Sequence, residues 1–273
     1  MKKESASIDF LYNTVPGRTI LKILVQPALS KAAAFLFSSG ISARIVPSFM
    51  NSNNIDPDLF ERPEGGYSSF NDFFTRKKKK EYINIEEGKL VCPCDALLTV
   101  SHIDENTMFD IKHCKYSAAS LLRDGMLASE FIGGTAYVFR LTPSHYHRYN
   151  FCTSGKLTLS RSIKGILHSV KPVCHEHFQV FVQNSRKYVS IKNDSLGDVI
   201  QMEVGALLVG KVSNHPAHKN MEVTAALEKG YFEYGGSSIV VLTKANAELP
   251  EKLLSRESIN GEIPVSLGEC LIP

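Results

Sequence analysis

Residues 230–242 read GYFEYGGSSIVVL, and this stretch indicates what kind of fold the chain adopts. Two glycines and two serines stand directly before a run of apolar residues. Glycine takes up the backbone conformations of tight turns, whereas valine and isoleucine favour strands. The pattern therefore predicts a turn that leads into a buried β-strand over Ser238–Thr243.

The same alternation of short apolar segments and turn residues extends through most of the chain. From residue 88 onward, short segments rich in Val, Ile, Phe and Tyr are separated by Gly, Pro, Asn and Asp. No long helical pattern intervenes, so a mostly antiparallel β-rich core is expected rather than a doubly wound sheet. Further strands are predicted over Ala136–Leu141, Lys156–Ile163, Phe178–Val182, Tyr188–Ile191, Val199–Val204 and Ala206–Val212.

The N-terminal part reads as helical. Apolar residues recur at spacings of three and four between Leu21 and Leu36, and their polar neighbours Arg18, Lys22 and Lys31 are all basic. Such a helix can lie in a membrane interface, or it can pack on the protein's own core, and the pattern leaves both open. We expect an α+β protein in which 1–80 form an N-terminal helical membrane-interface region and 81–273 a β-rich catalytic region.

Composition sets broad limits on function. The chain has 273 residues, of which 43% are hydrophobic and 22% charged, which is typical of a globular protein with a sizeable core. A net charge of +3 gives no reason to expect a nucleic-acid partner. No signal-peptide pattern opens the chain and no Cys-x-x-Cys pair occurs, so we expect reduced thiols on the cytoplasmic side.

The charge is concentrated in one run of five cations, residues 76–80. This run is either a solvated loop or a patch that meets anionic lipid headgroups, to which each surface cation contributes about 1 kcal/mol.

The Gly235-Gly236-Ser237-Ser238 segment also permits chemistry. A serine hydroxyl can attack the carbonyl carbon of the preceding residue, and glycine there leaves the approach open. The resulting ester can be eliminated by a base, which breaks the chain and leaves a pyruvoyl group. The ketone of that group can form a Schiff base with an amine and act as an electron sink. From composition alone, an ordinary glycine turn remains the simpler interpretation.

Several further blocks, in order, favour the chemical interpretation. The chain resembles the phosphatidylserine decarboxylases, in the bacterial branch whose cleavage motif reads GGST or GGSS, over roughly residues 7–245. The matching blocks are Ser69-Phe70-Asn71-Asp72-Phe73-Phe74-Thr75-Arg76, Pro93-Cys94-Asp95, Tyr146-His147-Arg148-Tyr149, Leu167-His168-Ser169-Val170, Asn184-Ser185-Arg186, Val204-Gly205-Ala206 and Lys229-Gly230-Tyr231-Phe232.

The resemblance implies cleavage between Gly236 and Ser237. Residues 1–236 would form a β chain and 237–273 an α chain that begins with a covalent pyruvoyl cofactor derived from Ser237. The two chains would stay together as a heterodimer, with a higher oligomer left open. The implied reaction converts phosphatidylserine to phosphatidylethanolamine and CO2, in phospholipid biosynthesis, on the cytoplasmic face of the cell membrane.

The resemblance also implies an Asp–His–Ser set for self-processing, and the histidine is where this chain departs. Asp95 matches the family aspartate. The family pattern D-Y-H-R-x-H reads His145-Tyr146-His147-Arg148-Tyr149-Asn150 here, so its second histidine is Asn150, which cannot act as a base. We expect His168 to replace that base and His147 to donate the proton after CO2 leaves. Loss of processing altogether is the competing explanation.

Two clusters of histidines suggest a metal site, and two other functions are compatible with the sequence. Cys174-His175-Glu176-His177 and His215-Pro216-Ala217-His218 lack the helix or the Cys-x-x-Cys pairs of common zinc sites, so no metal is expected. The alternatives are a pyruvoyl decarboxylase of a soluble amino acid, and a lipid-binding pseudoenzyme that never cleaves.

Overall fold

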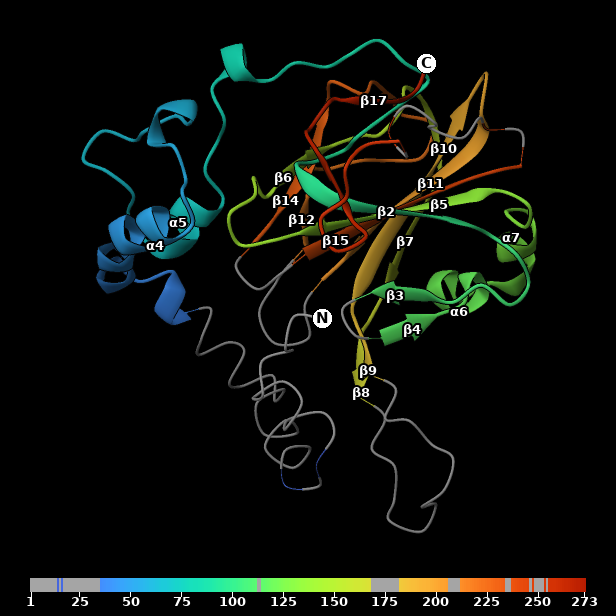
Figure 1. The fold of residues 1–273 in the computed structure, drawn as a ribbon, viewed down its shortest axis with the longest axis horizontal. Coiled ribbons are helices and arrows are strands. Elements are labelled where there is room, and N and C mark those ends of the chain that lie inside the picture. The colour runs from blue at the N-terminus through green and yellow to red at the C-terminus, as the bar shows by residue number, and fades with distance from the viewer. Residues whose placement is uncertain are drawn as a thin grey trace.

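The computed structural model describes Thr14, Pro16 and residues 35–111, 114–167, 182–205, 212–233, 237–245, 247, 253 and 255–273. Its centre is a sheet of eight antiparallel strands (Figure 1). The order across the sheet is β13 (Glu222–Val223), β7 (Gly155–Ile163), β10 (Arg186–Asn193), β11 (Gly197–Val204), β15 (Ser237–Thr243), β5 (Thr135–Leu141), β2 (Ala96–His102) and β16 (Ile263–Val265).

Smaller elements surround this sheet. A second sheet has the order β12 (Val212–Asn214), β14 (Glu228–Phe232) and β6 (Arg148–Asn150). Three strand pairs complete the β-structure of the described residues: β1 (Leu90–Val91) with β17 (Cys270–Ile272), β3 (Phe109–Ile111) with β4 (Cys114–Tyr116), and β8 (Ile166–Leu167) with β9 (Val182–Gln183). The expected α+β class is confirmed.

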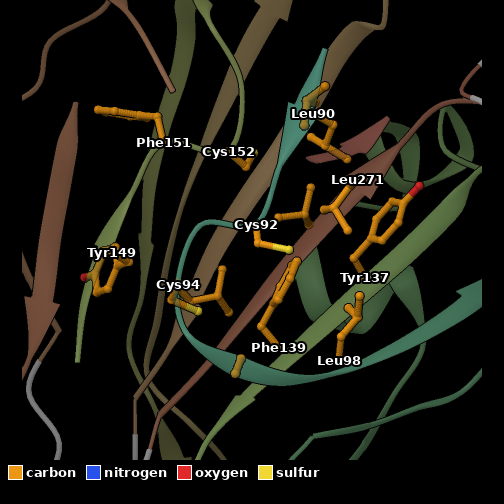
Figure 2. Packing of buried hydrophobic residues seen from close by; sticks show 14 of the residues in the cluster. Leu90, Cys92, Cys94, Leu98, Tyr137, Phe139, Tyr149, Phe151, Cys152 and Leu271 are labelled. Carbon is orange, nitrogen blue, oxygen red and sulfur yellow. The ribbon is translucent and has the colours of Figure 1, made fainter. Parts of the chain in front are cut away.

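Both faces of the main sheet are buried at its central strands β11, β15 and β5. Strand β15 shows this directly, since all seven of its residues are buried. Ile239 and Val241 belong to one apolar cluster and Val240 and Leu242 to another, as the alternation of side chains along a strand requires. Figure 2 shows residues of the first cluster, among them Tyr137 and Phe139 of the sheet, and Leu90, Phe151 and Leu271 from outside it.

The second face is covered by α6 (Ala118–Leu122) and α7 (Gly125–Ser129). Serine and aspartate cap these short helices: Ser117 accepts a hydrogen bond from the backbone of Ser120, and Asp124 from that of Leu127. They lie at the opposite end of the molecule from α4 and α5 (Figure 1).

A helical unit precedes the sheet in the chain. It comprises the 3-10 helices η1 (Gly40–Ile45), η2 (Pro57–Leu59) and η3 (Lys80–Tyr82), and the helices α4 (Val46–Ser52) and α5 (Phe70–Phe74). Ser69 caps α5 by accepting a hydrogen bond from the backbone of Asp72. Of the helix predicted between Leu21 and Leu36, residues 21–34 lie outside the described residues, and residues 35–36 are helical.

This unit is packed onto the loops of the β-region. Its apolar cluster contains Phe70, Phe73 and Phe74 together with Tyr146 and Leu267, which come from far along the chain. The N-terminal unit therefore contacts the segment that carries His147 and the segment around Leu267. No helix among the described residues combines the length and the hydropathy that a membrane-spanning helix needs.

Candidate active site

Ser237 is the first residue of β15, one position earlier than the sequence predicted. Its side chain is 2% exposed, and its hydroxyl makes no hydrogen bond to any residue that the structure describes. A buried hydroxyl normally has a partner, because an unsatisfied one costs about 1–3 kcal/mol. Residues 234–236, which include Gly236, lie outside the described residues.

Asp95 and Ser237 lie at the same edge of the main sheet, the one at which strands β2 and β15 both begin. Asp95 directly precedes β2, and β5 separates β2 from β15. The register fixes this placement, since Leu97 of β2 and Ser238 of β15 both pair with Arg140 of β5. At about 4.8 Å per strand, the two backbones are about 10 Å apart.

Both carboxylate oxygens of Asp95 have partners. Lys78 Nζ lies 2.9 Å from Oδ2, and the backbone N–H of Leu267 donates to Oδ1 at 2.8 Å. The side chains of Lys78 and Asp95 are 13% and 20% exposed, so this ion pair is only partly solvated. The carboxylate is thus fixed in direction by one cation and one backbone group.

The basic run that contains Lys78 is only partly exposed: Lys77 and Lys80 are exposed, whereas Arg76 is buried. Residues 77–79 are extended beside 59–61, where Phe60 and Lys78 form an antiparallel bridge. Side chains alternate along extended backbone, so Lys77 is exposed while its neighbours Arg76 and Lys78 face the protein.

Arg76 is the most enclosed member of that run. Its guanidinium lies over the rings of Phe60 and Phe73, at 4.3 and 4.7 Å from their centroids. It donates hydrogen bonds to the backbone carbonyls of Ser144 and His145. Burial lowers the pKa of Arg76 to about 10, which leaves the group charged near neutral pH.

We call residues 75–78 the strap, because they hold the segment 144–148 from one side. The backbone carbonyl of Thr75 accepts a hydrogen bond from Arg148 Nε at 2.8 Å, and the backbone N–H of Lys78 donates to the hydroxyl of Tyr146. Arg148 also pairs with the carboxylate of Glu228 at 2.7 Å. Arg148 is therefore fixed by one backbone carbonyl and one carboxylate.

His147 lies between Phe74 of the helical unit and Phe232 of β14. Its side chain is 1% exposed, and its ring centroid lies 3.9 Å from that of Phe74. Its backbone carbonyl accepts a hydrogen bond from Phe232, the last residue of β14. Four residues separate Phe232 from Ser237, so His147 is hydrogen-bonded to β14, the strand that precedes Ser237 in the chain.

Asn150, at the position of the family's second histidine, has a structural role. It is 6% exposed, and its amide nitrogen donates to the carbonyls of Ala225 and Ala226. Its own carbonyl accepts a hydrogen bond from Gln201 of β11. Asn150 thus joins strand β6 and the loop that precedes β14 to the main sheet.

His145 was treated in the sequence only as a replacement for an aspartate, yet it lies at the same sheet edge. It follows Leu141, which is the direct partner of Ser237 in β5. The backbone N–H of Thr142 donates to its Nδ1 at 3.0 Å, which places the proton of the neutral ring on Nε2. Burial lowers the pKa of His145, and the charge of Asp95 opposes that shift.

His168, the expected processing base, lies outside the described residues. Among the residues that are described, no group of three His, Cys, Asp or Glu side chains is arranged to hold a metal ion. The structure thus brings Ser237, Asp95 and His145 to one sheet edge and places His147 beside it.

Comparison with known proteins identifies the class to which this arrangement belongs. The profile of a family described as phosphatidylserine decarboxylase matches residues 70–272. A protein named phosphatidylserine decarboxylase proenzyme 2, from Clostridium acetobutylicum, is 38% identical over 97% of this chain and 91% of its own length. Proteins named phosphatidylserine decarboxylase proenzyme from Ruminiclostridium cellulolyticum and Clostridium tetani are each 35% identical, over 97% and 96% of this chain and 90% of their own lengths.

These relatives are precursors of decarboxylases. The chain belongs to the phosphatidylserine decarboxylase family, as its sequence motifs implied.

Proposed function

We propose that the chain is a proenzyme that cuts itself between Gly236 and Ser237. The products would be a β chain, 1–236, and an α chain, 237–273, whose first residue becomes a pyruvoyl group. The assembled pair would then decarboxylate phosphatidylserine to phosphatidylethanolamine and CO2. The observation that carries this proposal is the buried Ser237 hydroxyl without a described hydrogen-bond partner, at the sheet edge that also holds Asp95.

The proposed cleavage requires a nucleophile, the carbonyl carbon that it attacks and a base. Ser237 Oγ attacks the carbonyl carbon of Gly236, and the acyl group moves from nitrogen to oxygen to give an ester. A base then removes the Cα proton of Ser237, and the Cβ–Oγ bond breaks to release 1–236 with a C-terminal carboxylate. The dehydroalanine left behind adds water and loses ammonia, which leaves the ketone. We assign the base to His168, with Asp95 as the carboxylate that supports it.

Ser237 fits the role of cofactor precursor. It is the first residue of its strand, its backbone is held from Ser238 onward by β11 and from Ser237 onward by β5, and its hydroxyl is not engaged by a described residue. The pyruvoyl group would supply a ketone that condenses with the substrate amine and accepts electrons as CO2 departs.

His147 is the proposed proton donor to the carbon that loses CO2. Its ring is enclosed against Phe74 in the apolar cluster of the helical unit, and its backbone is fixed by Phe232. A proton held there is shielded from exchange with bulk water. Exclusion of water also favours decarboxylation, because a carboxylate loses its hydration on entering such a site.

We further propose that the protein binds peripherally to the cytoplasmic side of the cell membrane. The helical unit and the residues just before it expose large apolar side chains: Phe35 is 80%, Ile41 72% and Leu36 58% exposed. Arg44 follows closely in the chain, and Lys77 and Lys80 of the basic run are also exposed. Apolar side chains beside cations suit a surface that contacts anionic lipid.

Mass spectrometry of the purified wild type beside Ser237→Ala tests the cleavage. We expect the wild type to yield two fragments, with the C-terminal one starting at a blocked residue, and Ser237→Ala to stay whole. The same fragments from both would overturn self-cleavage, and an intact wild type near 30.3 kDa would favour the lipid-binding pseudoenzyme. Release of CO2 from phosphatidylserine in vesicles, against free serine, then separates the lipid enzyme from one that acts on a soluble amino acid.

A further inference from the structure

A fully buried ion pair joins the two sheets beneath Ser237. Glu203 of β11 is 0% exposed and Lys229 of β14 is 2% exposed, and Lys229 Nζ contacts both carboxylate oxygens at 2.5 Å. Removal of two charges from water is costly, and an apolar pair of similar size is often equally stable or more so. The pair is therefore poorly explained by stability alone.

Further polar groups complete this buried site. Asn214 Nδ2 donates to Glu203 Oε2 at 3.1 Å, and the hydroxyl of Tyr149 donates to Asn214 Oδ1 at 2.7 Å. The cation also lies 5.9 Å from the centroid of the Phe151 ring. Burial lowers the pKa of Lys229, and the Glu203 carboxylate works against that shift. The four polar residues form a connected set inside an otherwise apolar cluster.

The register places Glu203 close to Ser237. Glu203 pairs directly with Ile239 across β11 and β15, so their side chains point to the same face of the sheet. Ser237 precedes Ile239 by two residues and therefore shares that face. It is the diagonal neighbour of Glu203, at a Cα separation of about 7–8 Å.

Lys229 reaches this face because β14 is irregular at that point. The register between β14 and β6 shifts between Glu228 and Gly230, as in a β-bulge, which turns the intervening side chain in a new direction. Gly230 allows the close packing that follows, since a Cβ there would lie 2.4 Å from the carbonyl oxygen of Ser213. The local sequence Glu-Lys-Gly thus directs one lysine into the core.

We propose that the Glu203–Lys229 pair is a clamp that positions Ser237 for self-cleavage. The pair joins β14, which precedes the proposed cleavage site, to β11. Strand β11 is in turn paired with β15, which begins at Ser237. Glu233 and Ser237, on either side of the proposed cleavage site, are then held at fixed positions, and such fixation would favour the attack by Ser237 Oγ. Glu203 and Lys229 are positioning residues, and the inference rests on the proposed self-cleavage.

The decisive variant replaces the pair by apolar side chains of similar length, Glu203→Leu with Lys229→Met. Each single change leaves one buried charge unpaired, so both single variants should lower the thermal midpoint. The double variant should recover that midpoint while its cleavage stays at least tenfold slower than in the wild type. Lys244→Met is the matched control, because Lys244 pairs with Asp198 of β11 and Glu130 at the far end of the same strands. It should cleave within twofold of the wild-type rate.

A folded double variant that cleaves as fast as the wild type would overturn the clamp. Should that variant not fold, Glu203→Asp decides, since it keeps the charges but shortens the carboxylate arm. We expect it to fold and to cleave at least fivefold more slowly, and an unchanged rate would contradict the clamp.

Hydroxylamine separates positioning from a general loss of activity. It attacks the ester carbonyl, which leaves a hydroxamate on Gly236 and an unmodified Ser237 at the new N-terminus. Ester formation requires a positioned Ser237 but no later elimination, so hydroxylamine should cut a folded His168→Ala precursor faster than the double variant. Equal rates would overturn the clamp alone, whereas an uncut wild type would overturn the proposed self-cleavage on which it rests.

Discussion

Lys78 Nζ lies 2.9 Å from Asp95 Oδ2, and this contact joins the N-terminal helical unit to the edge of the main sheet. The same lysine donates its backbone N–H to the hydroxyl of Tyr146, next to His147. One residue of the basic run therefore fixes both the carboxylate and the histidine segment, whereas its neighbour Lys77 is exposed to solvent.

Replacement of Lys78 by methionine should slow cleavage by about tenfold or more. A hydrogen bond to a charged partner contributes about 1.5–3 kcal/mol, and its loss frees the carboxylate of Asp95 to turn. A time course of fragment formation measures the effect. Lys77→Met removes the same charge from the same run and should cleave normally, while Lys78→Arg should recover part of the rate. Equal rates for Lys78→Met and Lys77→Met would exclude this role.

His168→Ala should slow cleavage by roughly a hundredfold or more, since a positioned general base contributes about that much. His102→Ala, at the end of β2 that lies away from Asp95, serves as the control and should cleave normally. Mass spectrometry at fixed times compares the variants. Normal processing of His168→Ala would transfer the role to another group, and His145 would then be the next residue to replace.

Gly230→Ala should destabilise the protein by about 1–3 kcal/mol, because the added Cβ would lie 2.4 Å from the Ser213 carbonyl oxygen. Thermal unfolding should show a lower midpoint. Gly125→Ala, where a Cβ meets no atom within 4 Å, should be neutral or stabilise by up to about 1 kcal/mol, since Gly125 begins α7. A Gly230→Ala midpoint at or above the wild-type value would contradict the observed packing of β12 on β14.

Alkaline pH should destabilise the fold through Cys152. Burial raises the pKa of its thiol to about 12 from an ordinary value of 9.0, so the unfolded chain releases this proton at a lower pH than the folded one. Stability is full below about pH 9 and falls as the pH rises toward 12, by about 2 kcal/mol from this group at pH 10.5. Cys152→Ala should therefore lose less of its thermal midpoint between pH 8 and 10.5 than the wild type does. An equal loss would show that the thiol does not contribute.

Ile41→Asp should weaken binding to anionic vesicles by about tenfold, because insertion of one such apolar side chain contributes roughly 1.5–3 kcal/mol. Vesicle sedimentation measures this. Met126→Asp changes a side chain that is even more exposed, at 86%, but that lies on α7 at the other end of the molecule. It should bind normally, and equal weakening by both changes would argue against the helical unit as the contact surface.

The strands of the main sheet could be predicted because each has its own local signal. Tyr188–Ile191 and Val199–Val204 were predicted too short by a few residues but in the right places, since apolar β-branched runs mark the buried centres of strands. Strand ends depend on partners, which is why β15 begins at Ser237 rather than Ser238. The predictions over 178–181 and 206–211 concern residues that the structure does not describe, and the two-region division at residue 80 stays a prediction.

The site could be predicted only where a motif carried it. Asp95, His147 and Ser237 were named from the sequence, whereas the contacts of Lys78, His145 and Lys229 depend on segments distant in the chain. The inward direction of Lys78 follows from its pairing with 59–61, and that of Lys229 from a shift of register in β14. The pattern of apolar residues within one segment cannot predict either of these side-chain directions.

Strand β15 is hydrogen-bonded along both sides, to β11 and β5, and the C-terminal strands β16 and β17 pair with β2 and β1. A chain cut ahead of β15 keeps all of these bonds, so its two pieces can part only if the whole molecule unfolds. Refolding would then require two separate chains to meet, at a rate that falls with dilution. Such a protein reaches its native state once, as a single chain, and its lifetime afterward is governed by the unfolding rate rather than by an equilibrium.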